Sequence, residues 1–253
     1  MKQLLASALA AGAVTIMNPA VAAPPQRIFY SGHSLLDEPL PRDVGTIAAS
    51  LGTPLQWQRH TPSGSSIRDR LAAGAAARPG PGFDTLLVTE QHTLIGNLVW
   101  NDSARQLRRL HDDFIAANPQ GRTWFYASWL NIDDRTDPRR WIAYEREASP
   151  VWQCVAAQVD AALSAEGRTD RIAFVPAAAL LAALVERAAR GEIPGVSVAA
   201  LFRDDVHLTP LGSHYMSLVV FAALFERSPA GAAVPEGIDA AAARALQDQA
   251  WRL

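Results

Sequence analysis

The chain has 253 residues, of which 49% are hydrophobic and 19% charged, as is typical of a globular protein with one large domain or two small ones. Lys2 is the only lysine among 23 basic residues, and Cys154 is the only cysteine. These counts exclude a P-loop lysine, a Schiff-base lysine for a pyridoxal cofactor, an intrachain disulfide and a cysteine-rich zinc or iron–sulfur site. The formal net charge of −2 argues against nucleic acid as a partner, because such binding usually needs a basic face.

Residues 1–23 have the pattern of an export signal. Lys2 precedes an apolar, alanine-rich run over residues 4–17, and small residues at alternate positions over 20–23 suit signal peptidase. A membrane anchor or a first core helix is the alternative. However, the run is shorter than the roughly 20 residues of a spanning helix, and two prolines follow at 24 and 25. We therefore predict cleavage after residue 22 or 23, a periplasmic or secreted protein, and no membrane span after signal removal.

Beyond the signal, short β-branched and aromatic runs alternate with longer segments of helical periodicity, which indicates a parallel sheet covered by helices. Strands are expected at residues 27–31, 55–60, 83–89, 122–128 and 171–175. Helices are expected near 44–51, 66–77, 103–117, 141–165, 176–190 and 210–226. No internal repeat or linker is visible, so we predict one domain over residues 24–253. Its core spans about 27–226, and a surface helix near 240–251 follows a loop that begins at residue 228.

The first predicted strand ends in the segment Ser31-Gly32-His33-Ser34. Ligands bind at the carboxyl ends of parallel strands, and a glycine before Ser34 lets the backbone turn sharply enough to present the serine hydroxyl to a cleft. A serine that caps the next helix is the alternative interpretation.

A second polar segment, Arg203-Asp204-Asp205-Val206-His207, stands just before the helix predicted at 210–226. An aspartate and a histidine three residues apart on one loop can share a hydrogen bond. The carboxylate then fixes the imidazole tautomer and leaves the other ring nitrogen free to take a proton. Asp205 could replace Asp204, although the spacing favours Asp204, and a polar surface loop without function is the alternative.

The two segments together resemble the G-D-S-L and D-x-x-H blocks of the SGNH hydrolases, the GDSL-type esterase and lipase superfamily. The resemblance spans residues 27 to about 226. It implies a single three-layer α/β/α domain with a flavodoxin-like parallel five-stranded sheet and no cofactor. It also implies Ser34 as nucleophile, His207 as general base and Asp204 as the residue that orients His207. Ser34 does not lie in a G-x-S-x-G elbow, because Leu36 stands two residues after it, which argues against the other serine-hydrolase fold.

The resemblance further implies three donors to the oxyanion: the Ser34 N–H, a glycine N–H after the second strand and an asparagine side chain after the third. Gly64 fits the second position, with an ordinary turn as the alternative. The third block departs from the family pattern, since Thr89-Glu90-Gln91-His92 replaces G-x-N-D. Gln91 falls at the asparagine position and keeps an amide donor; Glu90 or His92 facing the pocket is the alternative.

Three other features carry weaker expectations. His33 replaces the family's aspartate before the nucleophile and could lie near Glu90, His92 and His207. We predict no metal there, because no ligand pair has helical i, i+4 spacing and the family needs none. After the fourth strand, Trp129 and Asn131 could line the substrate cleft. We expect His214 to pack within its helix or support the loop before it, and Cys154 to be buried.

The sequence thus predicts a secreted serine esterase or deacylase that acts on a small-molecule or carbohydrate ester of a small acyl group, through an acyl-enzyme. A polysaccharide O-acyltransferase on the same fold and a catalytically inactive SGNH-like binding module are the alternatives. The sequence leaves open the acyl-chain length, the alcohol portion of the substrate and the oligomeric state.

Overall fold

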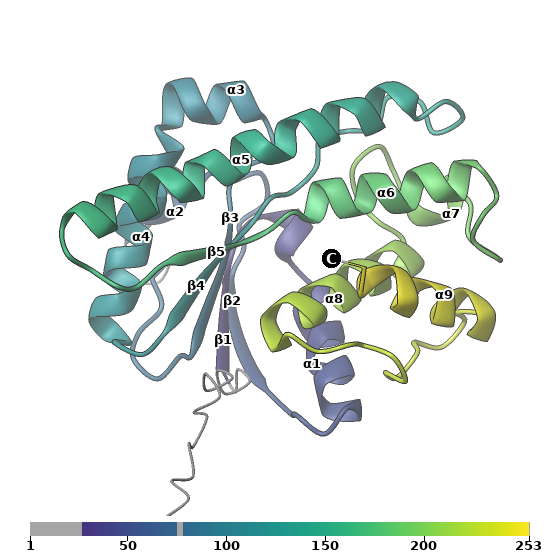
Figure 1. The fold of residues 1–253 in the computed structure, drawn as a ribbon, viewed down its shortest axis with the longest axis horizontal. Coiled ribbons are helices and arrows are strands. Elements are labelled where there is room, and N and C mark those ends of the chain that lie inside the picture. Colours follow the sequence, from purple (N-terminus) through teal and green to yellow (C-terminus); the bar gives the residue numbers. More distant parts are fainter. Residues whose placement is uncertain (1–26, 75–77, 253) are drawn as a thin grey trace, which may run out of the picture.

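The structure is a computed structural model that describes residues 27–74 and 78–252 (Figure 1). The predicted signal segment and residues 75–77 of the helix predicted at 66–77 lie outside the described residues. Five strands form one sheet: β1 (Arg27–Ser31), β2 (Gln56–His60), β3 (Thr85–Thr89), β4 (Arg122–Tyr126) and β5 (Ile172–Val175). All neighbouring strands are parallel, in the order β2-β1-β3-β4-β5, which confirms the flavodoxin-like sheet.

Helices connect successive strands, as the periodicity predicts: α1 (Leu40–Ser50), α2 (Ile67–Ala72), α4 (Ser103–Ala117) and α5 (Arg139–Ala165). The helices α6 (Ala177–Ala189), α8 (Pro210–Phe225) and α9 (Ala240–Ala250) follow β5. Four shorter elements were not predicted from the sequence: η1 (Ser34–Leu36), α3 (Leu94–Gly96), the π-helical turn η3 (Asn97–Asn101) and α7 (Val198–Leu201). These elements have three to five residues, which is too few for a helical period to stand out.

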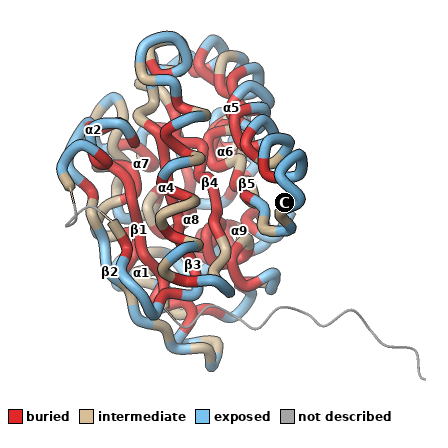
Figure 2. Tube along the Cα trace, turned by 90° about the vertical axis from the view of Figure 1, so that its left-hand side faces the viewer, coloured by how far each residue is buried: buried red, intermediate tan, exposed pale blue. Residues whose placement is uncertain are grey.

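The sheet separates two apolar cores because alternate residues of each central strand point to opposite faces. In β1, Ile28 and Tyr30 join the core formed with α1, α6 and α8, whereas Phe29 joins the core formed with α2, α4 and most of α5. Figure 2 shows the buried residues along the strands and on the inner sides of the helices. Three layers result, with helices on both faces of one sheet.

The C-terminal helix is more than a surface element. Leu246 of α9 is fully buried, and α9 packs on α8, which is buried on nearly all sides. The prediction of a buried Cys154 is wrong, because its side chain is exposed on α5. Trp152 and Val155 occupy the inner face of that helix, and the helical period turns residue 154 away from it. Among helices in the described ranges, none is both long and apolar enough to cross a membrane.

Candidate active site

The first side of the site is the turn that follows β1. Gly32 is packed so closely that an added Cβ would lie 2.7 Å from Leu36 Cβ in η1 and 3.1 Å from Thr89 Cγ2 at the end of β3, so a larger residue would displace the turn. Ser34 then begins η1 at the carboxyl end of the strand, and its side chain is half-buried. Glycine at position 32 is therefore needed for the close approach that places Ser34 at the sheet edge.

The second side is the loop between α7 and α8. A β-bridge joins Phe202 to Leu208, and the Arg203 N–H donates to the His207 carbonyl at 2.8 Å. Thr209 caps α8 by accepting from the Gly212 N–H, and its own hydroxyl donates to the Ala200 carbonyl at 2.6 Å. These contacts fasten both ends of the loop, so the histidine between them is held in one place.

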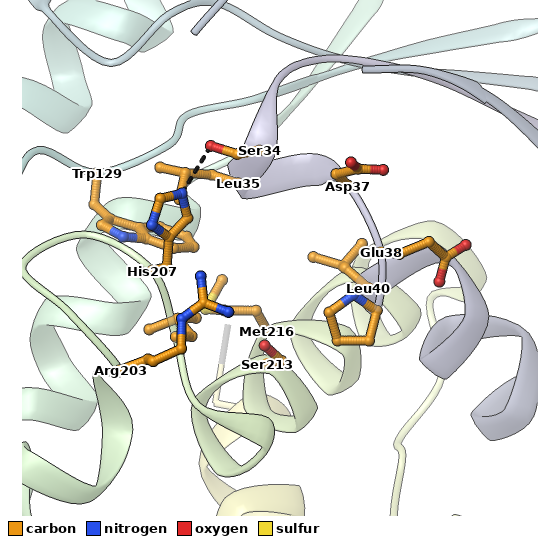
Figure 3. Close-up of a pocket in the computed structure, with 12 residues that line it drawn as sticks. Ser34, Leu35, Asp37, Glu38, Leu40, Trp129, Arg203, His207, Ser213 and Met216 are labelled. Carbon is orange, nitrogen blue, oxygen red and sulfur yellow. Dashed lines mark hydrogen bonds between the residues drawn. The ribbon is translucent and has the colours of Figure 1, made fainter. Parts of the chain in front are cut away.

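The two sides meet in a continuous chain of hydrogen bonds. The Ser34 hydroxyl lies 3.0 Å from His207 Nε2 (Figure 3), and His207 Nδ1 lies 2.9 Å from Asp204 Oδ2. Asp204 Oδ1 also accepts from the backbone N–H groups of His207, at 2.6 Å, and Val206, at 3.0 Å. These backbone bonds, more than the imidazole, hold the pKa of Asp204 well below its usual range. The carboxylate is thus ionised and can fix the tautomer in which Nδ1 carries the proton.

Asp205, which the sequence left as an alternative to Asp204, has a different role. Its carboxylate accepts from Asn131 Nδ2 at 2.9 Å, and its carbonyl accepts from the Ile132 N–H at 2.7 Å. The Trp129 indole N–H donates to the Val206 carbonyl at 2.8 Å. The loop after β4 therefore braces the loop that carries His207, which explains the polar residues noticed there in the sequence.

A cavity of about 180 Å³ opens beside Ser34 and His207 (Figure 3). Trp129, Leu40 and Met216 contribute apolar surface, and the Arg203 guanidinium extends between His207 and Met216. The full lining comprises Ser34, Leu35, Asp37, Glu38, Pro39, Leu40, Trp129, Arg203, His207, Leu208, Ser213 and Met216. Of the two residues predicted to line the cleft, Trp129 does so, whereas Asn131 contacts Asp205 instead.

Gly64 lies in the loop after β2 with a φ of +69°, a conformation that favours glycine. The Ser65 hydroxyl donates to the Gly32 carbonyl at 3.1 Å, which holds this loop against the turn that carries Ser34. Within the described residues, the Gly64 N–H has no hydrogen-bond partner and is available to a ligand.

Gln91 begins the loop after β3. Its side-chain oxygen accepts from the Thr93 N–H at 2.9 Å, from the Thr93 hydroxyl and from Asn97 Nδ2 at 2.9 Å. This leaves the amide NH2 as the end of Gln91 that could donate to a substrate. An oxyanion role for Gln91 and for Gly64 stays a prediction.

His33 and Glu90 face inward instead of into the cavity. The Glu90 carbonyl accepts from His33 Nε2 at 3.1 Å, and His33 Nδ1 accepts from the Leu35 N–H at 3.4 Å. Burial lowers the pKa of His33 to about 3, so its ring is neutral. His92 lies close by, with its ring centroid 5.8 Å from that of His33. In the parts of the chain that the structure describes, no group of three or more His, Cys, Asp or Glu side chains could hold a metal ion.

Two arginines near the site were not predicted from the sequence. Arg203 lines the cavity, and Arg70 lies buried beneath the strand ends. Arg70 stands two residues from the exposed Arg68 in a helix of only six residues, so no pattern marks it as an inward-facing residue. Arg203 adjoins the D-x-x-H block, and that adjacency is the one signal that could have indicated it.

No protein-family model matches the sequence, and no curated protein sequence matches it. Solved structures do match. A DUF4886 family protein from Bacteroides uniformis is 14% identical with a TM-score of 0.63, over 90% of this chain and 93% of its own. Axe2, an acetylxylan esterase from Geobacillus stearothermophilus, is 14% identical with a TM-score of 0.53, over 81% of this chain and 95% of its own. The chain therefore has the α/β/α fold of the SGNH-type esterases, and at such identities the similarity shows the fold alone.

Proposed function

We propose that the protein is a serine esterase or deacylase that hydrolyses esters of small acyl groups, with carbohydrate esters as the favoured substrates. The observation that carries this proposal is the unbroken chain from the Ser34 hydroxyl through His207 to Asp204, at the wall of a cavity. Such a chain activates a serine for attack on a carbonyl carbon and returns the proton to the leaving alcohol.

In the proposed reaction, Ser34 Oγ bonds to the carbonyl carbon while its proton moves to His207 Nε2. The resulting tetrahedral oxyanion accepts hydrogen bonds from the Ser34 N–H, the Gly64 N–H and the Gln91 amide. As the oxyanion collapses, the alcohol leaves with the proton from His207 and the acyl group stays on Ser34. Water then repeats the sequence, releases the acid and restores the serine. Asp204 stabilises the positively charged imidazole in both halves.

The shape of the cavity supports a small substrate. Its volume of about 180 Å³ is below the usual range for pockets that hold drug-sized ligands, roughly 300–1,000 Å³. Charged and hydroxyl groups, including Arg203, Glu38 and Ser213, line it beside the apolar residues. An acetyl group on a polar, sugar-like alcohol suits such a lining better than a long acyl chain does. The similarity in fold to Axe2, an acetylxylan esterase, points in the same direction.

The test compares wild type with Ser34→Ala on chromogenic acetyl, butyryl and long-chain esters and on acetylated sugars. We expect wild type to prefer acetyl esters, to react covalently with a fluorophosphonate at Ser34, and to lose both properties in Ser34→Ala. Equal rates in the two proteins would reject the proposal. Acyl transfer that outruns hydrolysis when a sugar acceptor is added would instead indicate an acyltransferase. Binding of substrate without labelling or turnover would indicate an inactive module.

Export is a separate part of the proposal and rests on the pattern of residues 1–23 alone. Expression of the full chain in a Gram-negative host should give a periplasmic protein whose N-terminus begins near residue 23 or 24, as read by intact-mass measurement. Full-length protein that stays in the cytoplasm would contradict this part and leave the chemistry untouched.

A further inference from the structure

Arg70 is a buried charge near the strand ends that bear the site. Arg70 lies on α2 and is only 2% exposed. Its guanidinium lies beneath the carboxyl edge of the sheet. Its Nε donates to the Ser31 hydroxyl at 3.0 Å, and Nη1 donates to the carbonyls of Gly32 at 3.2 Å and Ser65 at 2.9 Å. Nη2 donates to the Thr89 carbonyl. One side chain thus joins the ends of β1 and β3 and the loop after β2.

The partners of Arg70 are mostly backbone carbonyls. A guanidinium has five N–H donors in a rigid plane, so it can bind several carbonyls that point to one centre, which a lysine ammonium on a flexible stem does less well. Burial lowers the pKa of Arg70 to about 10, which leaves it protonated at neutral pH, and the nearby Glu90 charge favours that form. The cation therefore holds three converging segments by their carbonyl oxygens.

Glu90 holds the same segments by their N–H groups. One oxygen of its carboxylate accepts from the backbone N–H groups of Ile67 and Gln91, both at 2.9 Å. Its carbonyl accepts from His33, the residue directly before the nucleophile. Arg70 and Glu90 thus form a complementary pair, one supplying donors and the other acceptors to the loops around the site.

Each tied segment carries one of the oxyanion donors of the proposed reaction. The turn after β1 carries the Ser34 N–H, the loop after β2 carries the Gly64 N–H, and the loop after β3 carries Gln91. We propose that Arg70, assisted by Glu90, is a positioning residue that sets these three donors relative to one another, an inference that rests on the proposed function. Arg70 hydrogen-bonds to none of the side chains of Ser34, His207 and Asp204, so it acts through the backbone carbonyls and serine hydroxyls that it binds.

The expected size of the effect follows from the geometry that oxyanion binding requires. Donors must lie within hydrogen-bond distance of an oxygen that forms only in the transition state, and loss of one such donor costs about 10²–10³ in kcat. A displacement of a catalytic group by about 1 Å lowers the rate about 10²-fold. Loss of Arg70 should therefore lower kcat much more than it changes KM, because the ground-state ester does not depend on the full set of donors.

The experiment compares Arg70→Met and Arg70→Lys with wild type on a chromogenic acetyl ester, with rates counted per site titrated by a fluorophosphonate. We expect kcat to fall about 10²–10³-fold in Arg70→Met and less in Arg70→Lys, with KM within about threefold of wild type. The affinity for an alkylboronic acid, which forms a tetrahedral anion on a serine, should fall in parallel with kcat/KM. The pH dependence of kcat/KM should be unchanged, since the variants leave Asp204 and His207 intact.

Arg168→Met is the matched control, because Arg168 binds Asp112 and Asp170 far from the strand ends of the site. It should lower the unfolding temperature and keep wild-type kcat. Ser65→Ala is the milder second variant. It removes one hydroxyl that accepts from Arg70 and donates to Gly32, and kcat should fall about tenfold even if Arg70→Met does not fold.

If Arg70→Met folds and keeps the wild-type kcat and boronate affinity, the inference is overturned and the proposed function still stands. If Arg70→Met does not fold, the same result in Ser65→Ala overturns the inference. A wild type that neither hydrolyses esters nor reacts with the fluorophosphonate would overturn the proposed function and this inference with it.

Discussion

The protein holds a second chain of hydroxyl, imidazole and carboxylate, near the opposite edge of the sheet from Ser34. His111 of α4 lies with Nδ1 2.9 Å from the Thr123 hydroxyl, near the start of β4, and with Nε2 2.7 Å from Asp170 Oδ2, just before β5. The distances match those of the Ser34 chain within a few tenths of an ångström. The two chains therefore contain the same three kinds of chemical group, at nearly the same hydrogen-bond distances, at the two ends of one domain.

The surroundings of the two chains differ. The His207 side chain is 32% exposed and lines a cavity, whereas the His111 side chain is 0% exposed and Thr123 is buried inside the sheet. Asp204 is held by backbone N–H groups of its own loop, whereas Asp170 is held mainly by the guanidinium of Arg168. No ester can reach the Thr123 hydroxyl.

A hydroxyl–histidine–aspartate chain is therefore not by itself an active site. At the carboxyl edge of a parallel sheet, loops leave the strands with free N–H groups and space for a ligand. At the amino edge, the same three groups close a buried polar network that satisfies each of them. Access from the cavity beside Ser34, more than the three side chains, distinguishes the candidate site from this buried network.

The largest expected difference is between the two histidines. His207→Gln should lower kcat for an acetyl ester by about 10⁴–10⁶ and leave the free energy of unfolding nearly unchanged. His111→Gln should keep kcat and lower the free energy of unfolding by about 1–3 kcal/mol, because it removes the buried imidazole that hydrogen-bonds to Thr123 and Asp170. Initial-rate measurements give the kcat of both variants, and urea unfolding gives their free energies of unfolding. A tenfold loss of kcat in folded His111→Gln would mean that the two edges are coupled.

Substitution of Asp204 should likewise lower kcat and substitution of Asp170 should lower stability, with a smaller loss of kcat than for His207. Asp204→Asn places an amide where His207 Nδ1 needs an acceptor, so it favours the wrong tautomer, and kcat should fall about 10³–10⁴-fold. Asp170→Asn should cost about 1–3 kcal/mol of unfolding free energy and leave kcat at the wild-type value. Paired kinetics and thermal unfolding distinguish these outcomes. Equal kcat losses in the two variants would contradict the distinction between the edges.

Acid should lower the stability of the protein through a buried histidine outside the candidate site. His214, seven residues after His207, is fully buried, and burial lowers its pKa to about 4. The unfolded chain binds that proton near pH 6.5, so the contribution of neutral His214 is complete above this pH and is lost as the pH falls towards 4. Because one pH unit corresponds to about 1.4 kcal/mol, the loss by pH 4.5 is about 2–3 kcal/mol.

His214→Leu removes this titration, so its unfolding free energy should fall less between pH 7 and 4.5 than that of wild type. Urea unfolding at the two pH values measures the difference. Esterase activity should depend on pH in the same way in both proteins, since His214 does not line the cavity beside Ser34. An identical fall of unfolding free energy in the variant would show that other groups, such as buried His33, carry the acid sensitivity.

Much of the fold was predictable because its signals are local. The bounds of β1 and α4 agree with the sequence expectation to the residue, since alternation and helical period are strong there. The D-x-x-H spacing also predicted a contact that one loop forms by itself, and the structure places Asp204 against His207. Elements of a few residues, such as α3 and α7, carry no period and were missed.

The inward or outward orientation of a residue was harder to predict where its partners are distant in sequence. Cys154 was expected to be buried because the residues around it are apolar, but the phase of α5 against the sheet turned it outward. Arg68 and Arg70 are indistinguishable by composition, yet two positions along a helix separate opposite faces, and only the packing of α2 selects which face is inside.

Residues a few positions apart account for the order of strands and helices along the chain, the turn that presents Ser34 and the loop that pairs Asp204 with His207. Contacts between distant segments bring Ser34 to His207 across 173 positions, bring Thr123 and His111 together, and let Arg70 join the ends of β1 and β3 to the loop after β2. These contacts depend on which distant segments lie at the same end of the strands and on how much solvent remains between them. Local sequence patterns predict neither of these two properties.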